Sequence, residues 1–401
     1  MTVASSLRVV HGPVTDRQTL ALDWKLLEYH ADANIFLSWQ WIGIWLQVYQ
    51  PTAFALRVYE GDILVGLGLM VEVKERRHGV LVSRCLRLHQ TGHQHQDQIW
   101  IEYNGFLAKR GLEEEVASAC LQYLCNHWDE WDELVIGAIE VGQAKQYAKA
   151  SSLDMHVRWE APCYGVDLEA LRSADKEYLE HLSSNTRYQI RRAQRLYSKR
   201  GEVRLKRPAS IEEALVVYSA IGPAHLKRWG SGKDESGFAN PEFVKFHEEM
   251  INHHWEEGGI DLVTVYAGDE AIATFYNLVY HDTVYFYLGG LKVEEDNKLK
   301  PGLLGHSLCI EDYKQRGFKY YDFMGGEERY KTQLGNFHQG LVQVALQKNL
   351  WRFKLEKAAR RARNQFLISP LKPKKPCSEN RGKQSEPLPN AGWSVKTQEQ
   401  E

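Results

Sequence analysis

In the first half of the chain, some segments have apolar residues at helical spacing and others have them in the pattern of a strand. The first half is therefore predicted to be a mixture of helices and strands. Leu20, Trp24 and Leu27 lie at helical spacing and predict a helix over 16–31. A tryptophan-rich helix is expected next, at 36–49, and an apolar hairpin follows it. The further elements expected here are strands at 53–59, 63–74, 80–88, 98–106 and 132–139 and a helix at 112–128.

A similar order of elements returns in the second half. A helix broken near 183–185 and two amphipathic helices come first, and three apolar strands, a helix and two strands follow. The expected ranges are 175–200, 211–228, 241–257, 260–267, 271–280, 283–291, 302–316, 319–323 and 340–347. We therefore expect two α/β domains, at 1–165 and 166–348, each with a mixed central sheet flanked by helices.

Composition is that of an ordinary globular protein. Hydrophobic residues make up 43 % and charged residues 25 %, and the net charge of −2 gives no overall attraction to nucleic acid. The six cysteines are scattered and the longest apolar stretch, 63–71, is too short to cross a bilayer, so we expect a cytoplasmic protein with reduced thiols. A polar, proline-rich composition predicts a disordered tail at 372–401.

One segment of the second half suits a phosphate ligand. An apolar strand ends in Gly289-Gly290, and after a polar loop Pro301-Gly302 opens a helix beside Lys298 and Lys300. Free backbone N–H groups at a helix start, with added positive charge, can hold a pyrophosphate. The alternative is a capped helix start with two solvated lysines.

A second basic feature is the expected helix around Asn185–Gly201. Arg187, Arg191, Arg195 and Lys199 recur every four residues and share one face, with Arg192 beside them. Like charges on one face repel each other, which favours an anionic partner such as CoA, a nucleotide sugar or tRNA. The alternative is a solvated basic face.

A histidine-rich segment follows the third expected strand, 80–88. In an extended chain His93, His95 and Asp97 point to one side, as a metal site requires. Such a cluster is more often a polar loop, and we assign no metal.

Several short motifs occur in the order typical of one family. They are Asn34-x-Phe36-x-Ser38-Trp39 with Trp45, Ser184-Asn185-x-Arg187 with Arg191-Arg192, His225-x-x-Arg228-Trp229, Pro301-Gly302, and Asp322-Phe323 through Glu327 to Tyr330-Lys331. Over residues 30–345 the chain resembles the GNAT-like acetyltransferase domain of CelD-type cellulose and exopolysaccharide biosynthesis proteins, which are related to the Fem peptidoglycan-bridge transferases.

The resemblance implies two GNAT-like domains in tandem and an acyl-CoA donor. The donor's thioester arm would lie between strands 283–291 and 319–323, which splay apart in GNAT domains. Its binding residues would be Gly289, Gly290, Lys298, Lys300, Gly302 and Gly305. Leu299 stands where the family's phosphate loop has a basic or amide residue, and the Fem relatives use aminoacyl-tRNA instead.

The resemblance also implies the catalytic groups. Tyr330 would be the acid for the leaving thiolate, Glu327 or Glu328 the base, and Asp322 a residue that orients them. Binding of the other substrate would fall to Arg187, Arg191, Arg192, Trp229 and Lys331. The implied reaction is acyl transfer to an amine or hydroxyl of a saccharide or lipid-linked precursor of envelope polysaccharide. The alternatives are a Fem-like aminoacyl-tRNA-dependent transferase and a non-catalytic binding subunit of the same fold.

A basic amphipathic helix is expected at 349–371. Its apolar stripe consists of Trp351, Leu355, Ala358, Ala362 and Phe366. From Trp351 to Pro376 there are nine basic residues and one acidic residue, a net charge of +8. This pattern favours an anionic membrane surface, such as the inner membrane face, as a partner. The alternative is that the stripe packs back on the second domain.

Overall fold

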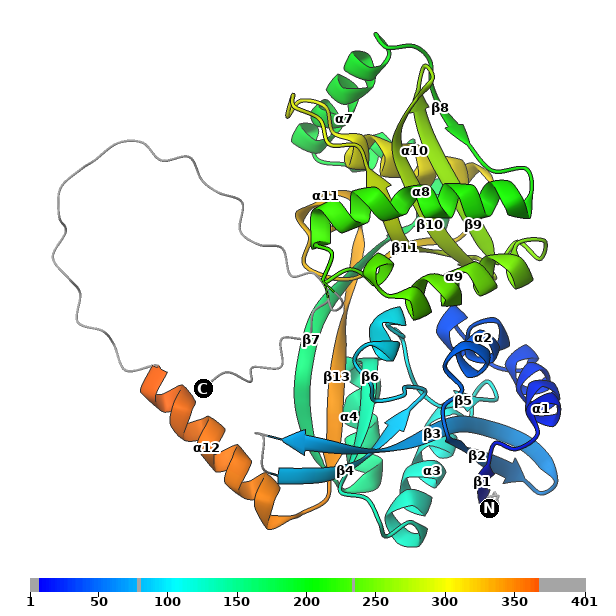
Figure 1. Ribbon diagram of the computed structural model, residues 1–401, viewed down its shortest axis with the longest axis vertical. Coiled ribbons are helices and arrows are strands. Elements are labelled where there is room, and N and C mark those ends of the chain that lie inside the picture. Colours follow the sequence, from blue (N-terminus) through cyan, green and yellow to red (C-terminus); the bar gives the residue numbers. More distant parts are fainter. Residues whose placement is uncertain (1–6, 78–80, 233–234, 368–401) are drawn as a thin grey trace, which may run out of the picture.

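A computed structural model describes residues 7–77, 81–232 and 235–367, with side chains up to residue 360 (Figure 1). The strands of these residues form one mixed sheet of 13 strands. Its order is β1-β2-β3-β4-β6-β13-β7-β12-β11-β10-β9-β8, with the short β5 paired to β3. The sheet is flanked by helices, as the sequence predicts.

The first half runs from β1 (Arg8–Pro13) through two helices and three antiparallel strands, after which one helix leads to a parallel strand. The elements are α1 (Arg17–Tyr29), α2 (Trp39–Tyr49), β2 (Ala53–Glu60), β3 (Ile63–Arg77), β4 (Leu81–Leu88), β5 (Leu107–Ala108), α3 (Glu113–His127), β6 (Glu133–Glu140), α4 (Val141–Ser151) and β7 (Asp154–Asp167). The parallel pair is β4 with β6.

The second half repeats this order after three helices, α5 (Leu168–Ser173), α6 (Tyr178–His181) and α7 (Ser184–Tyr197). Its elements are β8 (Val203–Lys206), α8 (Ile211–Trp229), α9 (Pro241–His254), β9 (Ile260–Ala267), β10 (Glu270–Tyr280), β11 (Thr283–Leu291), α10 (Pro301–Gln315), β12 (Tyr320–Gly325), α11 (Arg329–Leu334) and β13 (Phe337–Gln347). Again a helix separates a parallel pair, here β11 and β12. The repeated order confirms the predicted tandem α/β architecture.

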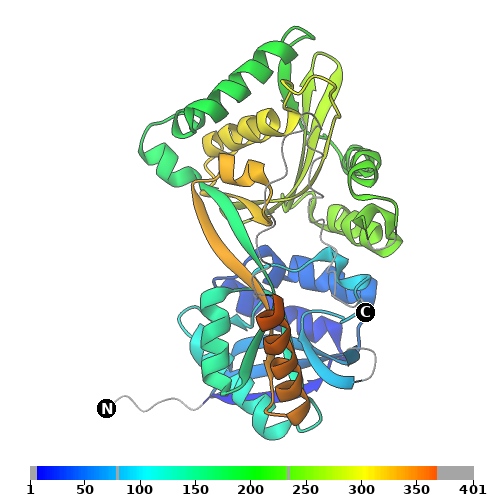
Figure 2. The same cartoon turned by 90° about the vertical axis from the view of Figure 1, so that its left-hand side faces the viewer.

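The final strand of each half is exchanged. β7 of the first half pairs with β12 of the second, and β13 of the second half pairs with β6 of the first. The two long strands also pair with each other, from Phe337 opposite Gly165 to Gln347 opposite Asp154. Figure 2 shows them running from the lower half of the molecule into the upper half. The domain boundary predicted at 165/166 falls within β7 and stays a prediction.

The two halves also share a hydrophobic core. Helices α2 and α9 pack together where the halves meet, with the Trp41 and Phe246 ring centroids 4.8 Å apart. Trp45 and Tyr276 are buried in the same cluster. The tryptophans that predict this helix therefore also form part of the contact between the two halves.

The prediction of a strand at 98–106 is wrong. Trp100 and Tyr103 have positive φ angles, +43° and +49°, which no regular strand accommodates. The segment is instead a 3₁₀ turn, Gln96–Ile99, followed by a buried loop. Strands β1, β7 and β8 were not expected from the sequence.

A twelfth helix, α12 (Trp351–Leu367), follows β13, in agreement with the expected basic helix. The tail expected at 372–401 lies outside the described residues. In the part of the chain that the structure describes, no helix has the length and apolar character needed to cross a membrane.

Candidate acyl-transfer site

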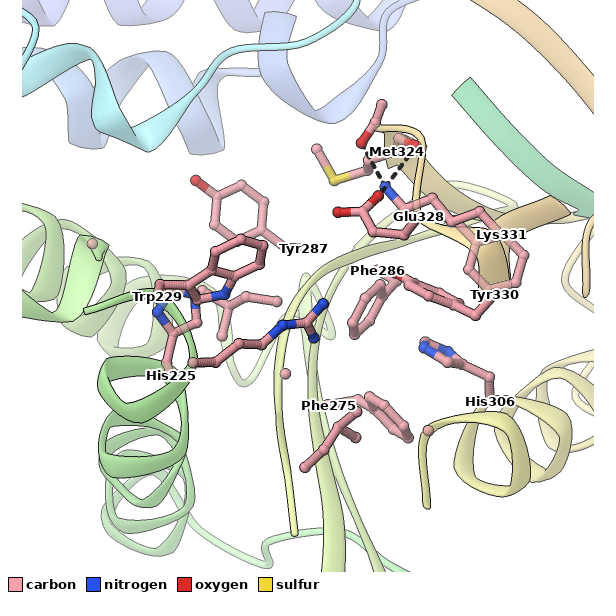
Figure 3. Close-up of a pocket in the computed structure, with 18 of the residues that line it drawn as sticks. His225, Trp229, Phe275, Phe286, Tyr287, His306, Met324, Glu328, Tyr330 and Lys331 are labelled. Carbon is pink, nitrogen blue, oxygen red and sulfur yellow. Dashed lines mark hydrogen bonds and ion pairs between the residues drawn. The ribbon is translucent and has the colours of Figure 1, made fainter. Parts of the chain in front are cut away.

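The strands β11 and β12 separate soon after they meet. They pair only from Thr283–Tyr285 opposite Tyr320–Asp322, although β11 continues to Leu291. A pocket of about 450 Å³ lies where they diverge (Figure 3). The gap between these strands that the resemblance implies is therefore present, and it is open.

Aromatic rings line much of this pocket. Some come from β10, the separating strands β11 and β12, α10 and α11, and others come from α8, α9 and the loop of the first half that precedes β5. The rings are those of Trp100, His225, Trp229, Phe243, Phe275, Phe286, Tyr287, His306, Phe323 and Tyr330. Because both halves supply them, the site depends on how the halves are joined.

The N-terminus of α10 borders the pocket. Lys300 is its N-cap residue and makes no side-chain capping bond, and Pro301 occupies the first turn. The first intrahelical bond runs from the Leu304 N–H to the Lys300 carbonyl, so the N–H groups of Gly302 and Leu303 precede it. Lys300 lines the pocket and gives this end positive charge, whereas Lys292, also in the lining, is paired with Glu270 and Glu294. The arrangement suits a phosphate group.

The expected donor residues divide into three groups. Gly289, Lys300 and Gly302 line the pocket. Gly305 and Gly290 lie outside its lining and allow close packing, since an added Cβ would lie 2.6 Å from the Phe275 ring and 3.2 Å from the Ile221 Cα respectively. Lys298 is exposed and does not line the pocket.

Tyr330 stands on the pocket wall as a neutral phenol. Its ring stacks on His306 with centroids 5.1 Å apart and planes 8° apart, and it meets Phe323 edge-on. Burial, reinforced by the nearby Glu328 carboxylate, raises the pKa of Tyr330 well above its ordinary value. A phenol that keeps its proton can act as a proton donor.

Two charged groups follow β12. The Glu328 carboxylate lies 3.1 Å from the Lys331 ammonium, and both residues line the pocket. Lys331 is 4 % exposed and also donates hydrogen bonds to the carbonyls of Met324 (3.3 Å) and Gly325 (2.5 Å). The other expected base, Glu327, is exposed and outside the lining.

Asp322 lies behind the wall rather than in the pocket. It accepts hydrogen bonds from the Tyr103 hydroxyl at 2.6 Å, the Met324 N–H at 2.6 Å and the Cys163 thiol at 3.3 Å. Burial raises its pKa. These contacts hold the end of β12 in place, and the orienting role of Asp322 stays a prediction.

Glu102 is a pocket residue that the sequence did not reveal. Its carboxylate accepts the Gly325 N–H at 3.0 Å, and the side chain is fully buried. Burial, together with the charges of Asp322 and Glu328, raises its pKa to about 8. No motif marks this position, because its partners lie in the other half of the chain.

His306 was also missed, although it follows the Pro301-Gly302 motif. Its Nδ1 lies 3.1 Å from the Tyr321 hydroxyl, and burial lowers its pKa to about 3, so the ring is neutral. Stacked between Phe275 and Tyr330, it sets the position of the tyrosine ring.

The remaining expected residues divide between the pocket and α7. Trp229 lines the pocket, with the Arg228 guanidinium 4.7 Å from its ring centroid. Arg187, Arg191 and Arg192 lie on α7 outside that lining, and among the described residues none of the three forms an ion pair. Their roles stay predictions.

The histidine-rich segment is a loop. The Asp97 carboxylate accepts hydrogen bonds from the Thr91 hydroxyl and from the N–H groups of Thr91 and Gly92. His95 lies 4.0 Å from Glu242 instead of beside Asp97 as a strand would place it.

Comparison with known proteins agrees with this geometry. Residues 184–332 match a family described as an acetyltransferase (GNAT) domain. A search of curated proteins found no match. Among solved structures, FemX is similar over 87 % of this chain and 99 % of its own, with a TM-score of 0.57 and 12 % identity.

Two further structures share the fold. The C-terminal domain of a putative lysylphosphatidylglycerol synthetase from Agrobacterium fabrum covers 88 % of this chain and 97 % of its own, with a TM-score of 0.51 and 7 % identity. L-PGS from Bacillus licheniformis covers 86 % and 96 %, with a TM-score of 0.50 and 10 % identity. At these identities the likeness shows the fold alone.

The domain match and the site geometry together identify an acyltransferase with a GNAT domain. The narrower resemblance to CelD-type proteins stays a prediction.

Proposed function

We propose that this protein moves an acyl group from an acyl-CoA thioester to an amine or hydroxyl of a saccharide or lipid-linked precursor of envelope polysaccharide. The observation that carries the proposal is the separation of β11 from β12 beside the N-terminus of α10. A thioester arm fits between the strands, and the pyrophosphate fits against Gly302 and Lys300 at the helix end.

The transfer needs one group that takes a proton from the acceptor and one that gives a proton to the leaving sulfur. Glu328 takes the proton as the acceptor nitrogen or oxygen attacks the thioester carbonyl. The C–S bond then breaks, and the Tyr330 hydroxyl protonates the departing thiolate. A proton passed through water from Glu328 to the tyrosinate restores both groups. The products are an amide or ester and free CoA.

The residues that line the rest of the pocket favour an acceptor that carries a ring or an acyl chain. Trp100 from the first half and Trp229 from the second both line it, with Glu102 as a buried polar group. Aromatic surfaces with a few convergent polar groups are typical of small-molecule sites.

Calorimetric titration with acetyl-, medium- and long-chain CoA tests the donor. We expect saturable binding to at least one thioester, and mass spectrometry of candidate amines and hydroxyls incubated with that donor then identifies the acceptor. No heat with any thioester would reject an acyl-CoA donor.

A second candidate donor is aminoacyl-tRNA. It is favoured by the arginines of α7, of which Arg191 and Arg195 are exposed, by Leu299 in place of a basic phosphate-loop residue, and by the FemX-like fold over both halves. Binding to tRNA would weaken steeply with salt, because released counterions dominate such affinity. The test compares Arg187→Glu/Arg191→Glu with a control of equal charge change on α4, Lys145→Glu/Lys149→Glu. Only the α7 variant should lose tRNA while both keep their circular dichroism spectra.

The third alternative, a non-catalytic subunit, predicts a closed cleft between these strands. The open pocket does not favour it.

A further inference from the structure

Helix α12 is attached to the first half of the molecule by one side only. Arg352 lies 2.5 Å from the Asp132 carboxylate, and Glu356 lies 2.7 Å from Arg77 on β3. Phe353 of α12 is buried on the side of the helix that faces the protein, with the Arg77 guanidinium over its ring. These contacts fix which side of the helix faces the protein.

The opposite side carries large apolar residues in solvent. Trp351 is 68 % exposed and Leu355 is 59 % exposed, and Ala358 continues the same stripe. Figure 2 shows the helix on the outside of the lower half. The alternative expected from the sequence, in which the stripe packs back on the second domain, is wrong for these residues.

The charge around the exposed stripe is positive. Lys354 and Lys357 are exposed, and Lys357 forms a solvent-exposed ion pair with Asp154 at 3.8 Å. Glu356, the only acidic residue among 351–367, is occupied by Arg77 and Arg360. The sequence continues with Arg361, Arg363, Lys372, Lys374 and Lys375.

We propose that the outer side of α12 binds an anionic lipid surface, with Trp351 and Leu355 inserted among the headgroups and the lysines facing anionic phosphates. Tryptophan and leucine beside basic residues are typical of helices that lie in a membrane interface. Each basic side chain adds to the attraction. A second copy of the chain is a less suitable partner for this surface. A two-fold contact would bring Lys354 and Lys357 of one copy close to the same lysines of the other, and these like charges repel each other.

Co-sedimentation of the full-length protein with vesicles tests the proposal without any substrate. Phosphatidylglycerol-containing vesicles should pellet the protein, pure phosphatidylcholine vesicles should not, and high salt should release it. Trp351→Ala/Leu355→Ala and Lys354→Glu/Lys357→Glu should each lower the partition coefficient on the order of tenfold or more.

Matched controls are available on two other helices. Leu22→Ala/Leu26→Ala on α1 removes two leucines that are 71 % and 66 % exposed, and Lys145→Glu/Lys149→Glu on α4 makes the same charge change as the lysine variant. Both controls should bind vesicles like the unmodified protein. Equal pelleting with neutral and anionic vesicles, no pelleting at all, or equal losses in the controls would overturn the proposal.

Discussion

Tyr330 keeps its ring stack with His306 whether or not it carries a hydroxyl. In Tyr330→Phe the packing against His306 and Phe323 is retained and only the proton donor is lost. We expect kcat to fall on the order of a hundredfold or more, while the donor's Kd from calorimetry stays unchanged. Turnover at the wild-type rate would show that Tyr330 is not the acid.

Glu327 and Glu328 are neighbours in the sequence but differ in position, which makes them a matched pair. Glu328→Gln removes a pocket carboxylate, and Glu327→Gln removes an exposed one. Steady-state kinetics should show a large fall in kcat for the first and little change for the second. Thermal unfolding serves as the control, because the buried Lys331 loses its ion pair in Glu328→Gln. Equal kcat in the two variants would contradict the assignment of the base.

Glu102 makes stability depend on pH in an unusual direction. Its pKa rises from an ordinary value of 4.5 to about 8 in the folded protein, so between these values the folded state holds a proton that the unfolded state has lost. Its contribution to stability is therefore complete at low pH and declines as pH rises from about 4.5 to 8, on the order of 5 kcal/mol in all.

Glu102→Gln removes this titration while leaving an oxygen for the Gly325 N–H. Denaturant unfolding at pH 5 and pH 8 should show a larger loss of unfolding free energy in the wild type than in Glu102→Gln. Equal losses would mean that the Glu102 pKa is not raised.

At the scale of elements, the start of α10 gives the sharpest test of donor binding. Gly302→Asp places a negative charge at the helix end proposed to bind pyrophosphate. Gly302→Ala adds the same Cβ, 3.0 Å from the Leu291 side chain, without the charge. We expect calorimetry to show a donor Kd at least about tenfold weaker for the aspartate than for the alanine variant. Similar Kd values would place the phosphate elsewhere.

Sequence patterns predicted the elements whose structure depends on local periodicity. Helices α1, α2, α8 and α9 have apolar stripes, and the start of α10 is marked by Pro301-Gly302. The loop at 98–106 misled the prediction because its alternating Ile99, Ile101 and Tyr103 imitate a strand. Its shape depends instead on distant contacts, such as the bonds from Glu102 to Gly325 and from Tyr103 to Asp322.

The same limit applies to the site. Tyr330, Lys331, Lys300 and Gly302, which the structure places in the pocket lining, could be predicted because they belong to contiguous motifs. Glu102 could not be predicted, because no neighbouring residue in the sequence indicates that it will be buried against β12. Residues whose role comes from the meeting of the two halves carry no local signal.

At the scale of the whole molecule, the exchanged strands predict that neither half folds alone. A chain cut at the exposed turn between Asp175 and Lys176 leaves the first fragment without β13 and the second without β7. Each fragment alone should lack a cooperative thermal transition, and the two co-expressed should form one soluble complex. Circular dichroism and gel filtration check this, and a cooperative transition in either isolated fragment would contradict it.

The exchange of β13 also bears on the order of events at the ribosome. β6 ends at residue 140, and the strand that covers its edge is complete only at residue 347. At typical synthesis rates the intervening chain takes roughly 10–40 s to appear. Throughout that interval the nascent first half has an unpaired apolar edge strand, which is the kind of surface that aggregates or recruits chaperones. Slow translation of the second half should therefore reduce the yield of folded protein.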